Sequence, residues 1–299
     1  MKILLLGKNG QVGWELQRAL APLGAVIALD RQGADGLSGD LADPAALAQT
    51  VREVAPRIIV NAAAYTAVDK AESDIALART INAGAPAALA REAATLGAWL
   101  VHFSTDYVFD GSGSVPWSED SPTGPLNVYG QTKLEGELAI RASGCKHLIF
   151  RTSWVFGTRG GNFAKTMLRL AQERDRLTVI NDQFGAPTGA ELLADVSAHA
   201  ILHADSSPDV SGTYHLAAAG TTTWHGYASH VIEAARRAGA PIKVDGHAIE
   251  AVPTSAFPTP ALRPGNSRLD TTRLRRTFGL ELPDWKLGVD RMLTEVLTR

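Results

Sequence analysis

The sequence predicts an α/β protein with a doubly wound parallel sheet and a smaller substrate-binding unit toward the C-terminus. Short apolar runs, many of them β-branched, alternate with alanine-rich amphipathic stretches, a pattern typical of strand–helix–strand units. A glycine-rich segment directly follows the first apolar run. After Asp205 the alternation loosens, and a proline-rich stretch appears between Pro253 and Pro264, which indicates a second unit built onto the sheet.

The predicted elements alternate along the chain. Strands are expected in the apolar runs Lys2–Leu6, Ala25–Leu29, Arg57–Asn61, Trp99–Ser104, His147–Thr152 and Thr178–Ile180. Helices are expected to begin near Gln11, Pro44, Ile75, Asn127 and Asn162, with another over Glu191–His203 and one from Trp224. A further short strand is expected before Asp40, and the run Thr213–Ala217 is assigned to the C-terminal unit.

Composition is ordinary for a globular enzyme. The 299 residues carry a formal net charge of -2 and 20% charged side chains, so nothing indicates a nucleic-acid partner. The apolar N-terminal run is too short for a signal peptide, and no segment approaches the roughly 20 apolar residues of a membrane span. Cys145 is the single cysteine, so no internal disulfide can form and a cytoplasmic location without a membrane partner is expected.

Three glycines predict a phosphate-binding loop. Gly7, Gly10 and Gly13 are spaced G-x-x-G-x-x-G after the first strand, with Gln11 and Val12 between the last two. Glycine lets the backbone approach a pyrophosphate, whose charge the N–H groups of the helix N-terminus then hold. Residues 1–150 are therefore expected to form a Rossmann-type dinucleotide-binding domain. Residues 151–299 are expected to form mainly the substrate-binding region, with roughly 165–220 returning to the first domain.

Charged residues at the end of the second strand are expected to contact the adenosine ribose of the cofactor. Asp30 ends that strand, where a carboxylate meets the adenosine ribose hydroxyls of NAD. Arg31 follows at once and could pair with the 2′-phosphate of NADP, so NADH and NADPH both stay open. Asp40 and Leu41 match an adenine-flanking position, although Asp40 is equally well placed as a helix cap before Pro44.

Small residues follow the strand that ends at Asn61. Ala62, Ala63 and Ala64 would leave room for a cofactor lying across the carboxyl edge of the sheet, where ligands bind in open α/β sheets. Their position directly after a buried strand favours this reading over that of ordinary helix-forming alanines.

Tyr129 and Lys133 are the candidate catalytic pair and also candidate cofactor contacts. They are four residues apart near the start of a predicted helix and share one face. A phenol has a pKa of about 10 and is a poor acid–base catalyst unless a cation such as Lys133 stabilises its phenolate. Another strand ends in Ser104, Thr105 and Asp106, so that Thr105 and Tyr129 could together hold a carbonyl oxygen.

With these residues in place, the chain resembles the extended short-chain dehydrogenase/reductases, and more closely the dTDP-4-dehydrorhamnose reductase family. The resemblance runs almost from end to end. The blocks that carry it are GKNGQVG from Gly7, NAAAYTAVDKAE from Asn61, STDYVFDG from Ser104, RTSWVF from Arg151, NDQFGAPT from Asn181 and RPGNSRL from Arg263.

The resemblance implies hydride transfer from NADH or NADPH to the C4 ketone of dTDP-4-dehydro-β-L-rhamnose, with Tyr129 as proton donor. The product is dTDP-β-L-rhamnose, at the last step of dTDP-L-rhamnose synthesis. Lys133 would bind the nicotinamide ribose and tune Tyr129. Thr105, with Thr66, would orient Tyr129 or the sugar oxygen.

Three positions match the family's sugar-nucleotide contacts: Ser104, Thr105 and Trp154. An indole offers a flat apolar wall to a sugar or base, and a core aromatic residue explains Trp154 equally well. The resemblance further implies a homodimer with a magnesium ion held at its interface by Glu15, Glu191 and Glu295. Surface glutamates on helices are the alternative for these three.

Two other activities use the same fold. A sugar-nucleotide 4,6-dehydratase would carry a second acid after Asp106, where this chain has Tyr107, while an epimerase stays open because its core motifs overlap. A non-catalytic regulatory subunit that binds a dinucleotide would not need a proton donor. The presence of both Tyr129 and Lys133 therefore argues against a regulatory subunit.

Overall fold

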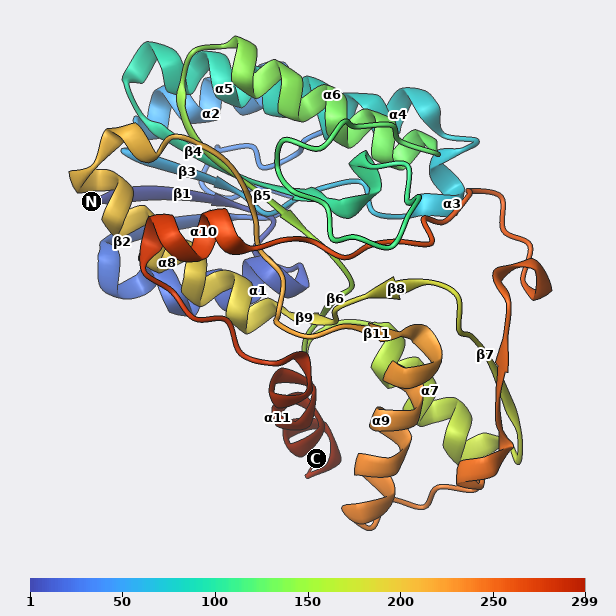
Figure 1. Cartoon of the computed structure of the whole chain (residues 1–299). Helices are drawn as coiled ribbons and strands as arrows, with labels where there is room; N and C mark the ends of the chain where they lie inside the picture. The colour runs from blue at the N-terminus through green and yellow to red at the C-terminus, as the bar shows by residue number, and fades with distance from the viewer. Residues whose placement is uncertain (299) are drawn as a thin grey trace.

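A six-stranded parallel sheet forms the centre of the computed structural model, which describes residues 1–298 (Figure 1). The strand order is β10-β5-β4-β3-β1-β2, and the neighbouring strands run parallel. The chain passes from β1 to β2 and then crosses to β3 on the other side of β1, so the sheet is doubly wound. The strands are β1 (Lys2–Leu6), β2 (Ala25–Leu29), β3 (Ile58–Asn61), β4 (Trp99–Thr105), β5 (Lys146–Thr152) and β10 (Gly212–His215).

Helices cover both faces of this sheet. Successive side chains of a strand point to opposite faces, so Ile3 and Leu5 pack into one core while Leu4 and Leu6 pack into the other. Burial on both faces explains why the strands are nearly continuous apolar runs, and it confirms the predicted α/β fold class. One face carries α1 (Gln11–Leu20), α8 (Ala190–Ser206) and α10 (Thr272–Phe278); the other carries α2 (Pro44–Val54), α5 (Ala85–Leu96) and α6 (Val128–Ala142).

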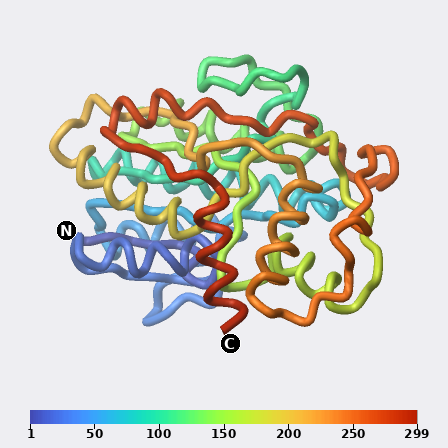
Figure 2. The backbone as a smooth tube through the Cα atoms, turned by 60° about the horizontal axis from the view of Figure 1, so that its bottom comes forward, coloured from blue at the N-terminus to red at the C-terminus, as the bar shows by residue number. Residues whose placement is uncertain are grey.

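A second group of elements lies beyond the carboxyl edge of the sheet and has its own apolar core (Figure 1). Its helices are α7 (Phe163–Glu173), α9 (Trp224–Arg237) and α11 (Trp285–Leu297). Its paired strands are β7 (Leu177–Ile180) with β12 (Ile249–Val252), β8 (Phe184–Gly185) with β11 (Thr222–Thr223), and β6 (Val155–Phe156) with β9 (Thr188–Gly189). Figures 1 and 2 both place α11 between the N-terminal elements and α9.

Short helices complete the chain. They are α3 (Val68–Ala71), α4 (Ile75–Arg79), a π-helical segment over Thr80–Gly84, and 3-10 helices over Ala21–Leu23, Asp106–Val108, Pro208–Val210, Gly246–Ala248 and Thr254–Ala256. No helix within residues 1–298 combines the length and the apolar character that crossing a membrane requires.

One predicted strand differs from the structure. The short strand expected before Asp40 is wrong, because residues 31–39 form a loop in which Gly33, Asp35 and Gly36 take positive φ values that no strand permits. The run Thr213–Ala217 overlaps β10 (Gly212–His215), an edge strand of the central sheet that pairs with β5.

The helix predicted from Ile75 is interrupted by the π-helical segment, which turns Asn82 inward. The Asn82 side chain accepts a hydrogen bond from Tyr65 N at 2.9 Å and donates to Tyr65 O at 3.1 Å and to Thr132 Oγ1 at 3.2 Å. Asn82 therefore fixes the loop after β3 to the helix layer.

Candidate active site

The glycine loop between β1 and α1 lies against the chain that follows β3. Gly7 has a φ of +87°, and a Cβ at this position would lie 2.8 Å from Ala63 N. A Cβ on Gly13 would collide with the carbonyl oxygen of Gly7. Glycine is therefore required at both positions, because neighbouring backbone fills the space that a side chain would need.

A cleft of about 480 Å³ opens beside this loop at the carboxyl end of the sheet. Ligands of open α/β folds bind at this edge, where the strand order reverses. The cleft brings together many of the predicted cofactor residues: Gly7, Gly10, Asp30, Arg31, Asp40, Leu41, Ala63 and Ala64. Thr66, predicted to orient Tyr129 or the sugar oxygen, also lines it.

Charged groups of both signs meet at one end of this cleft. Asp30 Oδ2 accepts a hydrogen bond from Asn9 Nδ2 at 2.7 Å and lies 3.6 Å from Lys8 Nζ. Arg31 Nε lies 3.5 Å from Asp40 Oδ2, and the Arg31 side chain is mostly exposed. A carboxylate and a guanidinium can thus both reach a ribose, which fits NADH and NADPH alike.

Three other predicted cofactor residues are held by protein contacts. Gln11 Oε1 accepts a hydrogen bond from Asn162 Nδ2 at 3.2 Å. Val12 and Ala62 are half-buried and pack against the core on the α1 side of the sheet. Their contacts with a cofactor stay predictions.

Tyr129 lies in the first turn of α6, beside the end of β4. Asn127 caps this helix by accepting a hydrogen bond from Gly130 N at 2.8 Å, which fixes where the first turn begins. Burial raises the pKa of the Tyr129 phenol to about 12; a hydrogen bond with the Thr105 side chain opposes this rise, and the charge of Asp106 adds to it. The fold thus brings Tyr129 and Thr105 together.

Lys133 lies one turn further along α6 and is buried. Its Nζ donates a hydrogen bond to Phe103 O at 2.6 Å and lies 3.1 Å from His102 Nε2. Burial lowers the pKa of the Lys133 ammonium to about 8, against the charge of Glu137, which raises it. A lysine that titrates near neutrality can exchange a proton in the pH range in which enzymes work.

Asp106 is a buried carboxyl group beside this pair, and sequence reasoning assigned it no role. Its Oδ1 accepts a hydrogen bond from Thr105 Oγ1 at 3.1 Å, while Oδ2 has no partner among the described residues. Burial raises the pKa of Asp106 to about 7, and the nearby Ser267 and Thr105 side chains oppose the rise. The signal in the sequence was an acidic residue at the end of a buried strand.

Ser104, a predicted sugar contact, makes a different contact in the protein. Its hydroxyl is buried and donates a hydrogen bond to Glu137 Oε1 at 2.5 Å. Glu137 in turn forms a buried ion pair with Arg151, with Arg151 Nη2 2.6 Å from Glu137 Oε2. Ser104 thus contributes to a polar network between β4, β5 and α6, and its contact with the sugar stays a prediction.

A second cleft, of about 460 Å³, lies between the sheet and the C-terminal elements. Its walls include Phe163, Trp224, Tyr107 and Arg263. The Tyr107 ring meets the Tyr129 ring edge-on, with 5.7 Å between the centroids, so this cleft reaches the candidate proton donor. Sequence reasoning missed Tyr107, Trp224 and Arg263 as site residues, although Arg263 opens one of the blocks that carry the family resemblance.

Arg263 is the cationic residue in the wall of this second cleft. Its Nη2 donates a hydrogen bond to Asp69 Oδ2 at 2.7 Å, which joins the C-terminal segment to α3. A guanidinium held in this way presents its remaining N–H groups in a fixed direction.

Trp154 lies behind the wall of the second cleft. Its indole stacks on Trp224 with 3.7 Å between centroids and an interplanar angle of 15°. A Cβ on Gly185 would lie 2.8 Å from the Trp154 ring, so glycine is needed there to admit the indole. The backbone of Trp154 has a φ of +49°, a strained value for a bulky residue. Its sugar contact stays a prediction, and its stacking supports Trp224.

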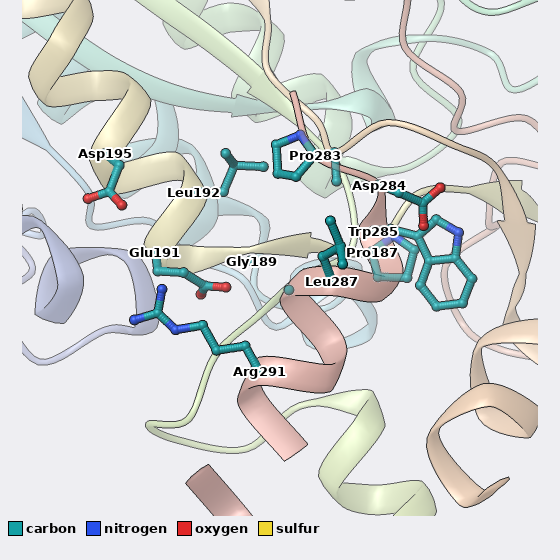
Figure 3. A pocket seen from close by; sticks show the side chains of 12 residues that line it. Pro187, Gly189, Glu191, Leu192, Asp195, Pro283, Asp284, Trp285, Leu287 and Arg291 are labelled. Carbon is teal, nitrogen blue, oxygen red and sulfur yellow. The ribbon is translucent and has the colours of Figure 1, made fainter. Parts of the chain in front are cut away.

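The three glutamates predicted to bind magnesium lie near one another. Glu191 lines a pocket of about 230 Å³ together with Arg291, and its carboxylate lies over Gly189 (Figure 3). Burial raises the pKa of Glu191, and the charges of Glu15 and Glu295 add to the rise. The part of the chain that the structure describes contains no group of three acidic, His or Cys side chains that could hold a metal ion. The role of the three glutamates as magnesium ligands stays a prediction.

Comparisons with known proteins cover the whole chain. A family model described as the RmlD substrate binding domain matches residues 1–298. A protein of Escherichia coli K12 named dTDP-4-dehydrorhamnose reductase is 60% identical over 298 residues, which is 100% of this chain and 99% of that protein. A protein of the same name from Burkholderia thailandensis is 48% identical over 305 residues, covering 100% of both.

Solved structures agree in fold. A dTDP-4-dehydrorhamnose reductase from Bacillus anthracis, in complex with NADP, is 34% identical with a TM-score of 0.88 and covers 98% of this chain and 99% of its own. One from Clostridium acetobutylicum is 36% identical with a TM-score of 0.87 and covers 100% of both chains.

Proposed function

The chain belongs to the dTDP-4-dehydrorhamnose reductase family, and from that premise we propose how its residues carry out the reaction. The protein is an NAD(P)H-dependent oxidoreductase. It reduces the C4 ketone of dTDP-4-dehydro-β-L-rhamnose to the alcohol of dTDP-β-L-rhamnose. This is the last step of dTDP-L-rhamnose synthesis, and the product is a precursor of cell-surface polysaccharide. The proximity of the Tyr129 phenol to the Thr105 side chain at the edge of the sheet carries the proposal.

Tyr129 donates the proton that turns the ketone oxygen into a hydroxyl. The reduced nicotinamide, when bound, supplies the hydride that the carbonyl carbon accepts. A phenol whose pKa is raised to about 12 by burial stays protonated at neutral pH, which a proton donor requires. The Thr105 hydroxyl holds Tyr129 in position and offers the ketone oxygen a second hydrogen bond.

The cofactor occupies the cleft beside the glycine loop. Gly7, Gly10 and Gly13 let its pyrophosphate approach the N-terminus of α1, and Asp30 with Arg31 reaches the adenosine ribose. Gln11, Val12, Asp40, Leu41 and Ala62–Ala64 complete the cofactor site in this proposal. Lys133 binds the nicotinamide ribose and supplies charge near Tyr129.

The sugar nucleotide occupies the second cleft. Trp224 and its aromatic neighbours offer flat apolar surface to the base, and Arg263 offers a fixed cation to the diphosphate. Tyr107 connects this cleft with Tyr129, which supports placing the ketone next to the phenol. Ser104, Thr66 and Trp154 keep the substrate roles that the family resemblance implies.

Four further properties belong to this proposal. The active form is a homodimer, and magnesium bound by Glu15, Glu191 and Glu295 would need the partner copy to complete its ligands. Hard carboxylate oxygens suit this ion. Residues 1–150 form the dinucleotide-binding domain, and residues 151–299 form mainly the sugar-nucleotide region, interleaved with it. The protein works in the cytoplasm, where reduced dinucleotides are available.

The test is a coupled assay in which the ketosugar nucleotide is generated by the preceding epimerase and oxidation of NADPH or NADH is followed optically. We expect Tyr129→Phe to lower kcat roughly 100-fold to 10,000-fold, the range of one general acid. The cofactor should still bind, because the phenol ring is kept. Tyr214→Phe, a buried tyrosine that donates its hydroxyl hydrogen bond to Val210 O, is the matched control. Unchanged turnover in Tyr129→Phe would remove this residue as the proton donor.

A further inference from the structure

His102 lies in a buried row of polar side chains and has no role in the reaction described above. It is in β4, directly opposite Asn61 of β3 in the strand register, and both side chains are fully buried. Asn61 Nδ2 lies 3.2 Å from His102 Nδ1, and His102 Nε2 lies 3.1 Å from Lys133 Nζ. The imidazole thus joins Asn61, near the cofactor cleft, to the lysine that lies one helical turn after Tyr129 in α6.

The backbone fixes the orientation of Asn61. Its Oδ1 accepts a hydrogen bond from Ala63 N at 3.2 Å, so its amide nitrogen faces His102 Nδ1. An amide NH2 group only donates, and Nδ1 must therefore accept and carry no hydrogen. The single hydrogen of a neutral imidazole is then on Nε2 and points at Lys133.

This arrangement has a consequence for Lys133. An ammonium group has three donors and no acceptor, so it cannot accept the hydrogen of Nε2. A neutral amine can accept it and still donate to Phe103 O. In the row from Ala63 through Asn61 and His102 to Lys133, each residue donates a hydrogen bond to the next. This arrangement is complete only when Lys133 is neutral.

Protonation of Lys133 requires the row to rearrange. The ammonium needs Nε2 as an acceptor, which moves the imidazole hydrogen to Nδ1. The Nδ1–H group then needs the Asn61 oxygen as its acceptor, so the Asn61 amide must turn. After this turn, the NH2 group of Asn61 faces the N–H of Ala63. One buried donor thereby loses its acceptor, a loss that costs about 1–3 kcal/mol in proteins.

We propose that His102 is a positioning residue that couples the charge of Lys133 to the orientation of the Asn61 amide. Neutral Lys133 goes with the Nε2–H tautomer and with Asn61 bound to Ala63, and cationic Lys133 goes with the Nδ1–H tautomer and a turned amide. The ring stays neutral in both states, since burial and Lys133 hold the pKa of His102 well below its usual range.

The proposal rests on the proposed function for its catalytic meaning. Each reduction uses the proton of Tyr129 and leaves a phenolate, which must be protonated again before the next cycle. The rearrangement makes the ammonium of Lys133 a stronger acid, so it gives up a proton to the phenolate more readily and becomes the neutral amine. A proton from solvent then restores the ammonium.

Other charged groups facing Lys133 act on the same equilibrium. Glu137, on the same helix, favours the ammonium, and its carboxylate is shared with Arg151 of β5 and with the hydroxyl of Ser104. Glu137 and His102 therefore act on Lys133 in opposite directions. Their balance places its titration near neutrality instead of near the pKa of a free lysine.

The direct test is nitrogen NMR of the whole protein labelled with ¹⁵N-histidine, because ring nitrogens with and without hydrogen differ widely in chemical shift. The His102 signals are assigned among the eight histidines by their loss in His102→Gln. We expect Nε2–H at pH 9.5 and a change to Nδ1–H as the pH is lowered through the titration of Lys133. The same tautomer at both ends, or a doubly protonated ring, would overturn the proposal. This measurement needs no substrate, so its outcome does not depend on whether the proposed function is correct.

The second test is the pH profile of kcat/KM. Gln at position 102 can present an amide oxygen to Nζ without a tautomer change, so we expect the alkaline pKa of His102→Gln to rise by about 0.7 to 2 units. His147→Gln, on the neighbouring strand β5 and away from Lys133, is the matched control and should leave the profile unchanged. An unchanged alkaline limb in a folded His102→Gln protein contradicts the coupling. If His102→Gln does not fold, the tautomer change in the parent protein still tests the proposal. The His102 signals are then identified by their shift in Asn61→Asp.

Discussion

Asp106 and Lys133 are buried near the end of β4 and Tyr129 is half-buried beside them, and desolvation is the largest influence on the pKa of each. It raises the pKa of Tyr129 to about 12 and that of Asp106 to about 7, and it lowers the pKa of Lys133 to about 8. At neutral pH the phenol therefore holds its proton. The residues that change charge near neutrality are its neighbours, Asp106 and Lys133.

Asp106 makes stability depend on pH. Its pKa rises from an ordinary 3.8 to about 7 on folding, so the unfolded chain loses this proton at a lower pH than the native protein. The stability that the neutral carboxyl contributes is fully present below pH 3.8 and is lost as the pH rises through about 7. Ionisation of this one group is therefore expected to weaken the fold at alkaline pH.

We expect Asp106→Asn to remove this dependence, because the amide keeps the shape of the carboxyl and cannot ionise. In thermal unfolding the variant should exceed the parent protein at pH 8, by an amount on the order of a few kcal/mol, and the gap should shrink at pH 5. Asp175→Asn, at an exposed position, should show no such difference. A gap that is the same at both pH values would mean that Asp106 is ionised without cost.

At the scale of elements, the π-helical segment is what links the helix layer to the cofactor cleft. Asn82 makes two hydrogen bonds to the backbone of Tyr65, and Tyr65 lines that cleft. A regular α-helix through Thr80–Gly84 would rotate Asn82 away from this loop. The interruption therefore serves the position of a loop that is far away along the sequence.

We expect Asn82→Ala to lower the free energy of unfolding by about 1–3 kcal/mol, because two half-buried backbone groups of Tyr65 lose their partners. Binding of NADPH should also weaken, since the loop after β3 is no longer held. Urea denaturation and fluorescence titration with NADPH measure the two effects. Thr95→Ala, on the exposed face of α5, is the control; a stable variant that binds NADPH normally would show that Asn82 does not position this loop.

The elements that the sequence predicts well are those with a local cause. The strands of the central sheet are apolar runs buried on both faces, and the helix starts at Pro44, Asn127 and Asn162 coincide with a proline or with side chains that cap the first turn. The π-helical segment and the edge strand β10 depend on partners distant in sequence, Tyr65 and β5, and no periodicity signals them.

The same division applies to the candidate site. Tyr129, Lys133 and Thr105 were found from spacing and strand ends, which a single sequence displays. The partner of Ser104 is Glu137, and the partner of Arg263 is Asp69, 194 positions away, so neither contact has a local signal. From the sequence, His102 is an ordinary residue of a predicted buried strand. Its role depends on neighbours from β3 and α6, which no local pattern indicates.

At the scale of the whole molecule, the two clefts belong to different parts of the fold. The glycine loop and the sheet edge line one cleft, and the C-terminal elements complete the other. The ion pair between Arg263 and Asp69 connects the segment after β12 with α3, which follows β3 in the chain. Arg263 is therefore placed to influence sugar-nucleotide binding without touching the cofactor cleft.

This separation gives a prediction for Arg263→Gln. A charge-assisted hydrogen bond to a diphosphate contributes about 1.5–3 kcal/mol, so affinity for dTDP should fall roughly 10-fold to 100-fold. Affinity for NADPH should stay within about twofold, because the dinucleotide cleft is unchanged. Calorimetric titration of each ligand measures both constants, with Arg276→Gln, exposed on α10, as control. Equal losses for both ligands would indicate that the variant disturbs the fold, and no loss for dTDP would place the diphosphate elsewhere. Only a selective loss agrees with a molecule in which the sheet edge binds the cofactor and the C-terminal elements bind the sugar nucleotide.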